Sequence, residues 1–108
     1  MVTEFIDSSY RLVLREHFET RDDFEKMLNW MRDDFTFYQQ ECNEGLKVFF
    51  PNGWFEINLI ETPSVEYEIR VNSKCNKSLV KTYNKILSVV NHFKKYKKSF
   101  LKEDIICN

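Results

Sequence analysis

Polar and apolar side chains alternate along four stretches of this 108-residue chain, with the period of a β-strand that has one covered face. These stretches are residues 10–18, 46–50, 54–61 and 65–71, and the last of them alternates most regularly. Pro51-Asn52-Gly53 lies between the second and third stretches and is typical of a hairpin turn. The side chains expected to point into the core are Tyr10, Leu12, Leu14, Leu46, Val48, Phe50, Phe55, Ile57, Leu59, Val65, Tyr67, Ile69 and Val71.

Two other stretches have apolar residues at spacings of three and four, which predicts amphipathic helices. The first begins after Thr20, whose hydroxyl can cap a helix, and runs towards Gly45, which suits a left-handed cap. Within it, residues 33–40 also fit a turn followed by a strand, and both possibilities remain open. The second helix is expected over residues 78–102. Its apolar stripe consists of Leu79, Tyr83, Ile86, Leu87, Val90, Phe93 and Phe100.

The predicted order is therefore strand, helix, three-stranded meander, helix. Short connections favour antiparallel neighbours, so we expect an α+β fold with an antiparallel sheet and both helices on one face. A chain of this length predicts a single domain over residues 1–108. The odd number of cysteines and the absence of a long apolar run favour a cytoplasmic protein without a membrane span.

The opposite face of the predicted sheet is unusually apolar for a surface open to water. Large apolar side chains and acids alternate there, which indicates contact with a partner or a homodimer through this open face. Coverage by the chain's own termini is the alternative. The residues expected on this face are Lys47, Phe49, Trp54, Glu56, Asn58, Ile60, Glu66 and Glu68.

The outer face of the first helix offers a second candidate contact surface. If the helix continues through residues 33–40, Trp30 and Phe37 lie together opposite its buried stripe, with Asp33 and Asp34 beside them. Exposed aromatic side chains ringed by acids are typical of interface anchors. The alternative is that these rings pack inside the fold.

Charge is divided unevenly along the chain although the net charge is only −1. Residues 1–69 hold 15 acidic and 6 basic side chains, whereas residues 70–108 hold 10 basic and 2 acidic ones. Either the two halves pair with each other inside the fold, or each faces a partner of opposite sign.

Catalytic and cofactor signatures are largely absent. With Gly45 and Gly53 as the only glycines, no phosphate-binding loop can be formed, and the cysteines and histidines lack zinc-ligand spacing. We therefore expect no enzyme activity, no cofactor and no metal site.

The leading hypothesis is a small protein-binding module that inhibits or modulates a larger protein, such as one that handles nucleic acid. The bias towards Lys, Asn, Ile and Phe fits an AT-rich phage or mobile element as its source. The alternative is nucleic-acid binding through cations on one side of the final helix. The residues of that alternative site are Lys77, Lys81, Lys85, His92 and Lys95.

Overall fold

One antiparallel sheet with two helices forms the fold, seen here in a computed structural model that describes residues 2–6, 9–18, 20–61 and 65–107. The six strands lie in the order β1-β2-β6-β5-β4-β3, and every neighbouring pair is antiparallel. The elements in chain order are β1 (Val2–Ile6), β2 (Ser9–Phe18), α1 (Arg21–Asp34), β3 (Gln39–Cys42), β4 (Leu46–Phe50), β5 (Gly53–Glu61), β6 (Val65–Ser73) and α2 (Asn76–Cys107).

The α+β class and the antiparallel sheet are confirmed. The predicted order of elements lacked two strands, β1 and β3, which form the two edges of the sheet. β3 begins at the end of the segment 33–40, which fitted either a helix or a turn and strand, and continues to Cys42. The predicted break at residues 62–64 lies outside the described residues.

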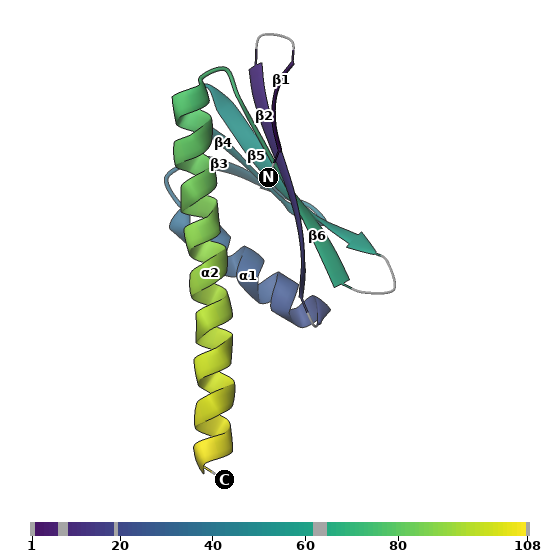
Figure 1. Ribbon diagram of the computed structural model, residues 1–108, viewed down its shortest axis with the longest axis vertical. Coiled ribbons are helices and arrows are strands. Elements are labelled where there is room, and N and C mark those ends of the chain that lie inside the picture. The colour runs from purple at the N-terminus through teal and green to yellow at the C-terminus, as the bar shows by residue number, and fades with distance from the viewer. Residues whose placement is uncertain (1, 7–8, 19, 62–64, 108) are drawn as a thin grey trace.

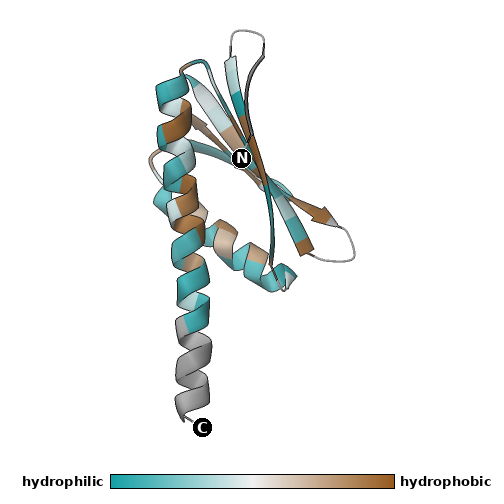
Figure 2. Ribbon diagram, viewed as in Figure 1, coloured by the Kyte–Doolittle hydropathy of each residue, from teal (hydrophilic) through white to brown (hydrophobic). Residues whose placement is uncertain are grey.

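Both helices pack on the same face of the sheet, as predicted. A single hydrophobic cluster contains side chains from both helices and from the inward positions of β2, β4, β5 and β6. Figure 1 shows α2 crossing α1 and extending beyond the sheet, and Figure 2 shows the apolar positions of α2 along its first half. The residues of the core that are fully shielded from water include Phe24, Met27, Met31, Val48, Phe55, Ile57, Tyr67, Ile69, Val71, Leu79, Ile86 and Phe93.

The start of α1 matches the prediction, and its end agrees with the alternative of a turn followed by a strand over residues 33–40. The amide of Asp23 donates a hydrogen bond to Thr20 Oγ1 over 3.1 Å, so Thr20 is the N-cap. The helix then ends at Asp34 instead of continuing towards Gly45. Gly45 has no left-handed conformation, so the predicted helix cap at this residue is wrong. A Cβ atom there would lie 2.2 Å from the carbonyl oxygen of Ile57, so close strand packing requires the glycine.

The turn between β4 and β5 forms where the sequence predicted it. Asn52 adopts a φ of 73°, a left-handed conformation that asparagine tolerates better than most residues. Its carbonyl oxygen accepts a hydrogen bond from the amide of Lys74 over 2.8 Å. This contact ties the hairpin to the loop after β6 and fixes the start of β5.

Candidate functional site

The sheet face that carries no helix is the larger of the two predicted contact surfaces. We call it the open sheet face, and it comprises the outward side chains of β2, β6, β5, β4 and β3. Phe55 and Ile57 are fully buried on the helix side, so the alternating positions Trp54, Glu56 and Asn58 project from the opposite side. The strand pairing arranges these outward side chains in rows across the sheet.

The first of these rows is aromatic at its centre. Trp54 on β5 lies directly opposite Phe49 on β4, and both side chains are partly exposed. Asn72 on β6 and Gln39 on β3 flank this pair in the same register. We call these four residues the aromatic row. It places two large rings side by side on a face that no helix covers.

The second row carries charges of alternating sign. Arg70 on β6 pairs with Glu56 on β5, which pairs with Lys47 on β4, which pairs with Glu41 on β3. We call these four residues the charged row. The ammonium group of Lys47 also lies 4.7 Å from the ring centre of Trp54 and 5.3 Å from that of Phe49. The two rows are thus joined by a cation over both rings.

Glu68, predicted as an accessible acid, is instead nearly buried, with 7% of its surface exposed. Its carboxylate accepts a hydrogen bond from Arg15 Nε over 3.0 Å and another from Arg70 Nε. Burial raises the pKa of the Glu68 carboxyl, but the hydrogen bonds and charges of Arg70 and Arg15 outweigh burial and lower the pKa overall. Two guanidinium groups therefore neutralise this acid, and it is not free to attract a basic partner.

The predicted surface on α1 does not form as expected. Trp30 packs edge-on against Phe93 at 5.3 Å between ring centres, and it packs at a tilt against Tyr96 at 5.2 Å, because α2 covers that side of α1. Asp33 and Asp34 remain exposed and line a hollow of about 450 Å³ together with Trp30, Val89 and His92. The structure therefore places the predicted acids between the two helices, away from the open sheet face.

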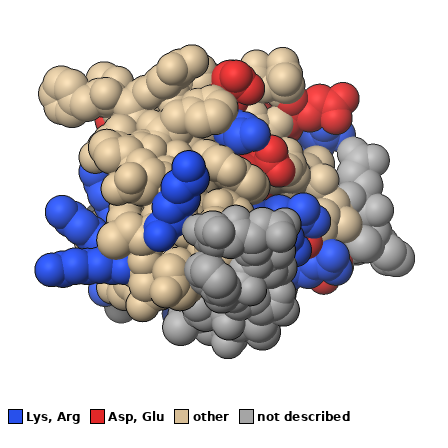
Figure 3. Space-filling view, turned by 90° about the horizontal axis from the view of Figure 1, so that it is seen from above, with Lys and Arg blue, Asp and Glu red and all other residues tan. Residues whose placement is uncertain are grey.

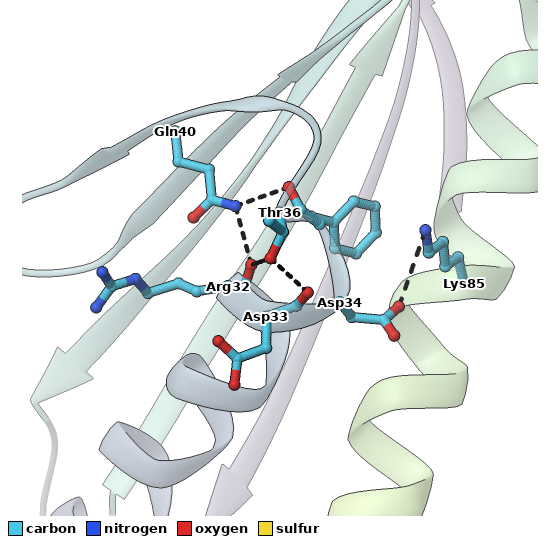
Figure 4. A network of polar contacts seen from close by, with 7 residues as sticks. Arg32, Asp33, Asp34, Thr36, Gln40 and Lys85 are labelled. Atoms are coloured by element: carbon cyan, nitrogen blue, oxygen red, sulfur yellow. Dashed lines mark hydrogen bonds and ion pairs between the residues drawn. The ribbon is translucent and has the colours of Figure 1, made fainter.

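Phe37 is separated from Trp30 by the turn that ends α1, and its side chain is 99% exposed. This turn is held by side chains, as Figure 4 shows. The side-chain Nε2 of Gln40 donates to the carbonyl oxygens of Arg32 and Phe35 over 3.0 Å and 2.8 Å, and the hydroxyl of Thr36 donates to the carbonyl oxygen of Asp33 over 2.7 Å. These bonds satisfy the last carbonyls of the helix and leave the Phe37 ring in water.

Ion pairs join the basic second helix to the acidic first half of the chain. Lys94 Nζ lies 3.0 Å from Glu16 Oε2, and Lys97 Nζ lies 2.8 Å from Asp23 Oδ1. Lys85 Nζ lies 3.9 Å from Asp34 Oδ2, as Figure 4 shows. These contacts agree with the first explanation of the uneven charge, in which the basic and acidic halves of the chain pair with each other inside the fold.

The residues of the alternative nucleic-acid site are all exposed along α2. Lys85 is held by its ion pair and lies 4.5 Å from the ring centre of Phe35. In the view of Figure 3, basic side chains gather on one side, while acidic and basic ones lie next to each other elsewhere. The five side chains in question are Lys77, Lys81, Lys85, His92 and Lys95.

One hollow was not expected from the sequence. A crevice of about 820 Å³ lies between α1 and the edge of the sheet at the β3–β4 turn. Its walls come from α1, β3, β4 and β5, so no local sequence pattern signals it. Its polar lining includes Arg21, Glu25, Arg32, Cys42, Glu44 and Asn58.

Among the described residues, no cluster of three or more His, Cys, Asp or Glu side chains could hold a metal ion. Within that same part of the chain, no helix is both long and apolar enough to cross a lipid bilayer.

Comparison with known proteins identifies the fold alone. No family model matches the chain, and no curated protein sequence matches it. The structure is similar to the crystal structure of CalU16 from Micromonospora echinospora, with a TM-score of 0.52 and 9% sequence identity. The match covers 94% of this chain and 88% of CalU16. At this identity the two proteins share an arrangement of elements, and the candidate site has to be interpreted from its own chemistry.

Proposed function

We propose that this chain is a non-enzymatic protein-binding module that binds through the open sheet face. The observation that carries the proposal is the pair of partly exposed rings, Trp54 and Phe49, opposite each other in the aromatic row. Ile60 on the same face is also only partly buried. Antiparallel sheets with one solvated face normally carry polar side chains on it, so these three residues favour coverage by another macromolecule.

The aromatic row supplies the anchors that protein interfaces use. Tryptophan and phenylalanine each bury a large area at a small cost in side-chain entropy, and a few such residues dominate binding energy. Lys47, whose ammonium group lies over both rings, adds a charged group at the edge of this apolar area. Neutral contact area bordered by charge is the usual anatomy of a protein–protein interface.

The signs of the surrounding charges favour a protein partner over a polyanion or a polycation. In the charged row, two acids alternate with two basic side chains, so this row has no net charge to attract nucleic acid. This arrangement supports modulation of a larger protein through direct contact and does not support imitation of nucleic acid charge. The exposed thiols of Cys42 and Cys75 suit a reducing compartment, and we place the interaction in the cytoplasm.

The test is capture of partner proteins by the immobilised chain. Wild-type chain should retain a specific protein from a lysate of the source organism, and a Phe49→Ala, Trp54→Ala double variant should lose that protein. Phe37→Ala is the matched control, because its ring is exposed but belongs to the turn between α1 and β3 and not to the aromatic row. Equal retention by the double variant, or loss with Phe37→Ala alone, would contradict binding through the open sheet face.

A second candidate function is nucleic-acid binding along α2. The observation that favours it is a row of exposed cations, of which Lys77, Lys81 and Lys95 all lie on α2. A row of this kind can follow a phosphate backbone. The absence of arginine from this row counts against it, since lysine alone gives no bidentate phosphate contact.

A salt titration separates the two functions. If α2 binds nucleic acid, affinity for DNA or RNA falls steeply with salt concentration. Replacement of Lys77, Lys81, Lys85 and Lys95 by Gln should then abolish the binding of DNA and RNA. Binding that is absent at low salt would remove this candidate and leave protein binding as the function.

A further inference from the structure

The charged row on the open sheet face has a sequence of signs that complements itself. From β6 to β3 its members are Arg70, Glu56, Lys47 and Glu41, which is positive, negative, positive, negative. Reversed, the same row becomes negative, positive, negative, positive. A second copy that approaches with the strand order reversed would therefore place an opposite charge over each member of the row.

We propose that the open sheet face binds a second copy of this chain about a two-fold axis. The axis lies between the two stacked sheets, parallel to the strands and above the gap between β4 and β5. The proposal rests on the assignment of this face as the protein-binding surface and names its occupant. Two antiparallel sheets that stack face to face keep their strands nearly aligned and lie about 10 Å apart, which is compatible with this axis.

The contacts made by the charged row follow from that axis. β5 of each copy lies over β4 of the other, so Glu56 faces Lys47 of the partner subunit, and Lys47 faces Glu56 of the partner subunit. β6 of each copy lies over β3 of the other, so Arg70 faces the partner's Glu41. An axis above β5 would place Glu56 opposite the partner's Glu56, and an axis above β4 would place Lys47 opposite the partner's Lys47. Both arrangements bring like charges together. The position between the two strands pairs all four charges with opposite ones.

The same axis also brings the rings of the two copies together. In the aromatic row, Trp54 faces the partner's Phe49, and Phe49 faces the partner's Trp54. At the outer ends of the row, Asn72 of each copy faces the partner's Gln39, so polar side chains border the rings. Stacked aromatic pairs contribute beyond the area that they bury. The rings thus supply affinity, whereas the alternating charges set the alignment of the two sheets.

The charged side chains remain accessible enough for such contacts, and Arg70, whose Nε donates to Glu68 of its own chain, keeps its other guanidinium nitrogens for the partner subunit. Arg70 and Glu41 are exposed, and Lys47 and Glu56 are partly exposed. Four strands at a spacing of about 4.8 Å make a patch roughly 19 Å wide, which is small for a permanent interface. We therefore expect a reversible dimer whose population rises with protein concentration, and which a larger partner can displace from the same face.

Sedimentation of the full chain over a concentration series tests the proposal. Wild-type chain should move from a monomer of 13.2 kDa towards a species of twice that mass as its concentration rises. Lys47→Glu places two acids opposite each other at each symmetric contact, and Glu56→Lys places two lysines there. Each variant alone should raise the dimer dissociation constant about tenfold or more.

Mixing the two variants makes the test specific for this axis. When a Lys47→Glu chain meets a Glu56→Lys chain, both contacts again pair opposite charges, so the mixture should recover most of the association that each variant lost. Lys77→Glu is the control for charge reversal away from the interface, because Lys77 is exposed on α2. Circular dichroism of each variant verifies that the fold is retained.

Each outcome of this experiment decides the proposal. A wild-type chain that stays monomeric at every concentration would overturn it, as would single reversals without effect or a mixture that does not recover association. Its failure is distinguishable from failure of the proposed function. A monomeric chain whose Phe49→Ala, Trp54→Ala variant loses a captured protein would keep the open sheet face as a binding surface and exclude the second copy as its occupant.

Discussion

The carboxylate of Glu68 on β6 lies 3.0 Å from Nε of Arg15, a residue on the neighbouring strand β2. Arg70 binds the other oxygen of the same carboxylate. Together these arginines lower the pKa of Glu68 in spite of its burial. A carboxyl whose pKa is lower in the folded state stabilises the fold above its ordinary pKa of about 4.3, and the contribution is lost as pH falls through the folded value.

Replacement of this acid should change stability in a pH-dependent manner. Glu68→Gln should lower the free energy of unfolding by about 1 kcal/mol near neutral pH, since both arginines are partly exposed and regain water. In acid, where wild-type Glu68 is itself protonated, the difference should vanish. Urea unfolding at both pH values measures it, with the exposed Glu44→Gln as control. A difference that is the same at both pH values would show that the ion pairs are not its source.

The buried hydroxyl of Tyr67 should be dispensable. Tyr67 is fully shielded from water, its ring stacks on Phe18 at 5.0 Å between ring centres, and its hydroxyl has no hydrogen-bond partner. Tyr67→Phe should therefore raise the free energy of unfolding by about 1 kcal/mol, because it removes an unsatisfied polar group and keeps the ring. Thermal unfolding measures the change, and a clear loss of stability would contradict it.

The same substitution should alter stability in alkali. Burial, and secondly the charge of Glu16, raise the pKa of the Tyr67 hydroxyl. A raised pKa means that the stabilising effect is present below the ordinary tyrosine value of about 10 and is lost as pH rises beyond it. Wild-type chain should thus lose stability in that range more steeply than Tyr67→Phe. Identical pH profiles for the two chains would contradict the assigned cause.

Gly53, which precedes Trp54, should not accept a side chain. A Cβ atom at this position would lie 2.1 Å from the carbonyl oxygen of Asn72, and the backbones of Gly53 and Asn72 belong to the paired strands β5 and β6. Gly53→Ala should therefore separate the start of β5 from β6 and lower the free energy of unfolding by about 1–3 kcal/mol. Asn52→Gly is the control, since glycine tolerates the φ of 73°. Equal melting temperatures for wild type and Gly53→Ala would contradict this steric explanation.

Alternation along the strands was sufficient to predict the open sheet face. The period of two along each strand placed Phe49, Trp54 and Glu56 on one side of the sheet. The burial of Phe55 and Ile57 on the opposite side agrees with this assignment. Its rows required the strand register, which local sequence does not specify. Phe100, assigned to the apolar stripe of α2, lies outside the residues whose side chains the structure describes.

The end of α1 could not be predicted from periodicity. Phe35 continues the apolar spacing of the helix and is buried, yet the chain turns there because Gln40 caps the last carbonyls from five residues away. Trp30 posed a different difficulty, since its spacing put it on the outer side of α1. Only the position of α2 reveals that Phe93 and Tyr96 cover it. A side chain beyond the helix end determines the first outcome and a distant helix the second, and the spacing of apolar residues within α1 contains no information about either.

The chain's two tryptophans can show whether the open sheet face is a protein-binding surface. Trp54 lies on that face, whereas Trp30 lies between the helices, so their indole N–H resonances in a ¹H–¹⁵N NMR spectrum report on the two surfaces separately. If the open sheet face binds protein, the Trp54 resonance should shift or broaden as the chain is concentrated or a captured partner is added, while that of Trp30 stays in place. A shift confined to Trp30, or none in either, would contradict it.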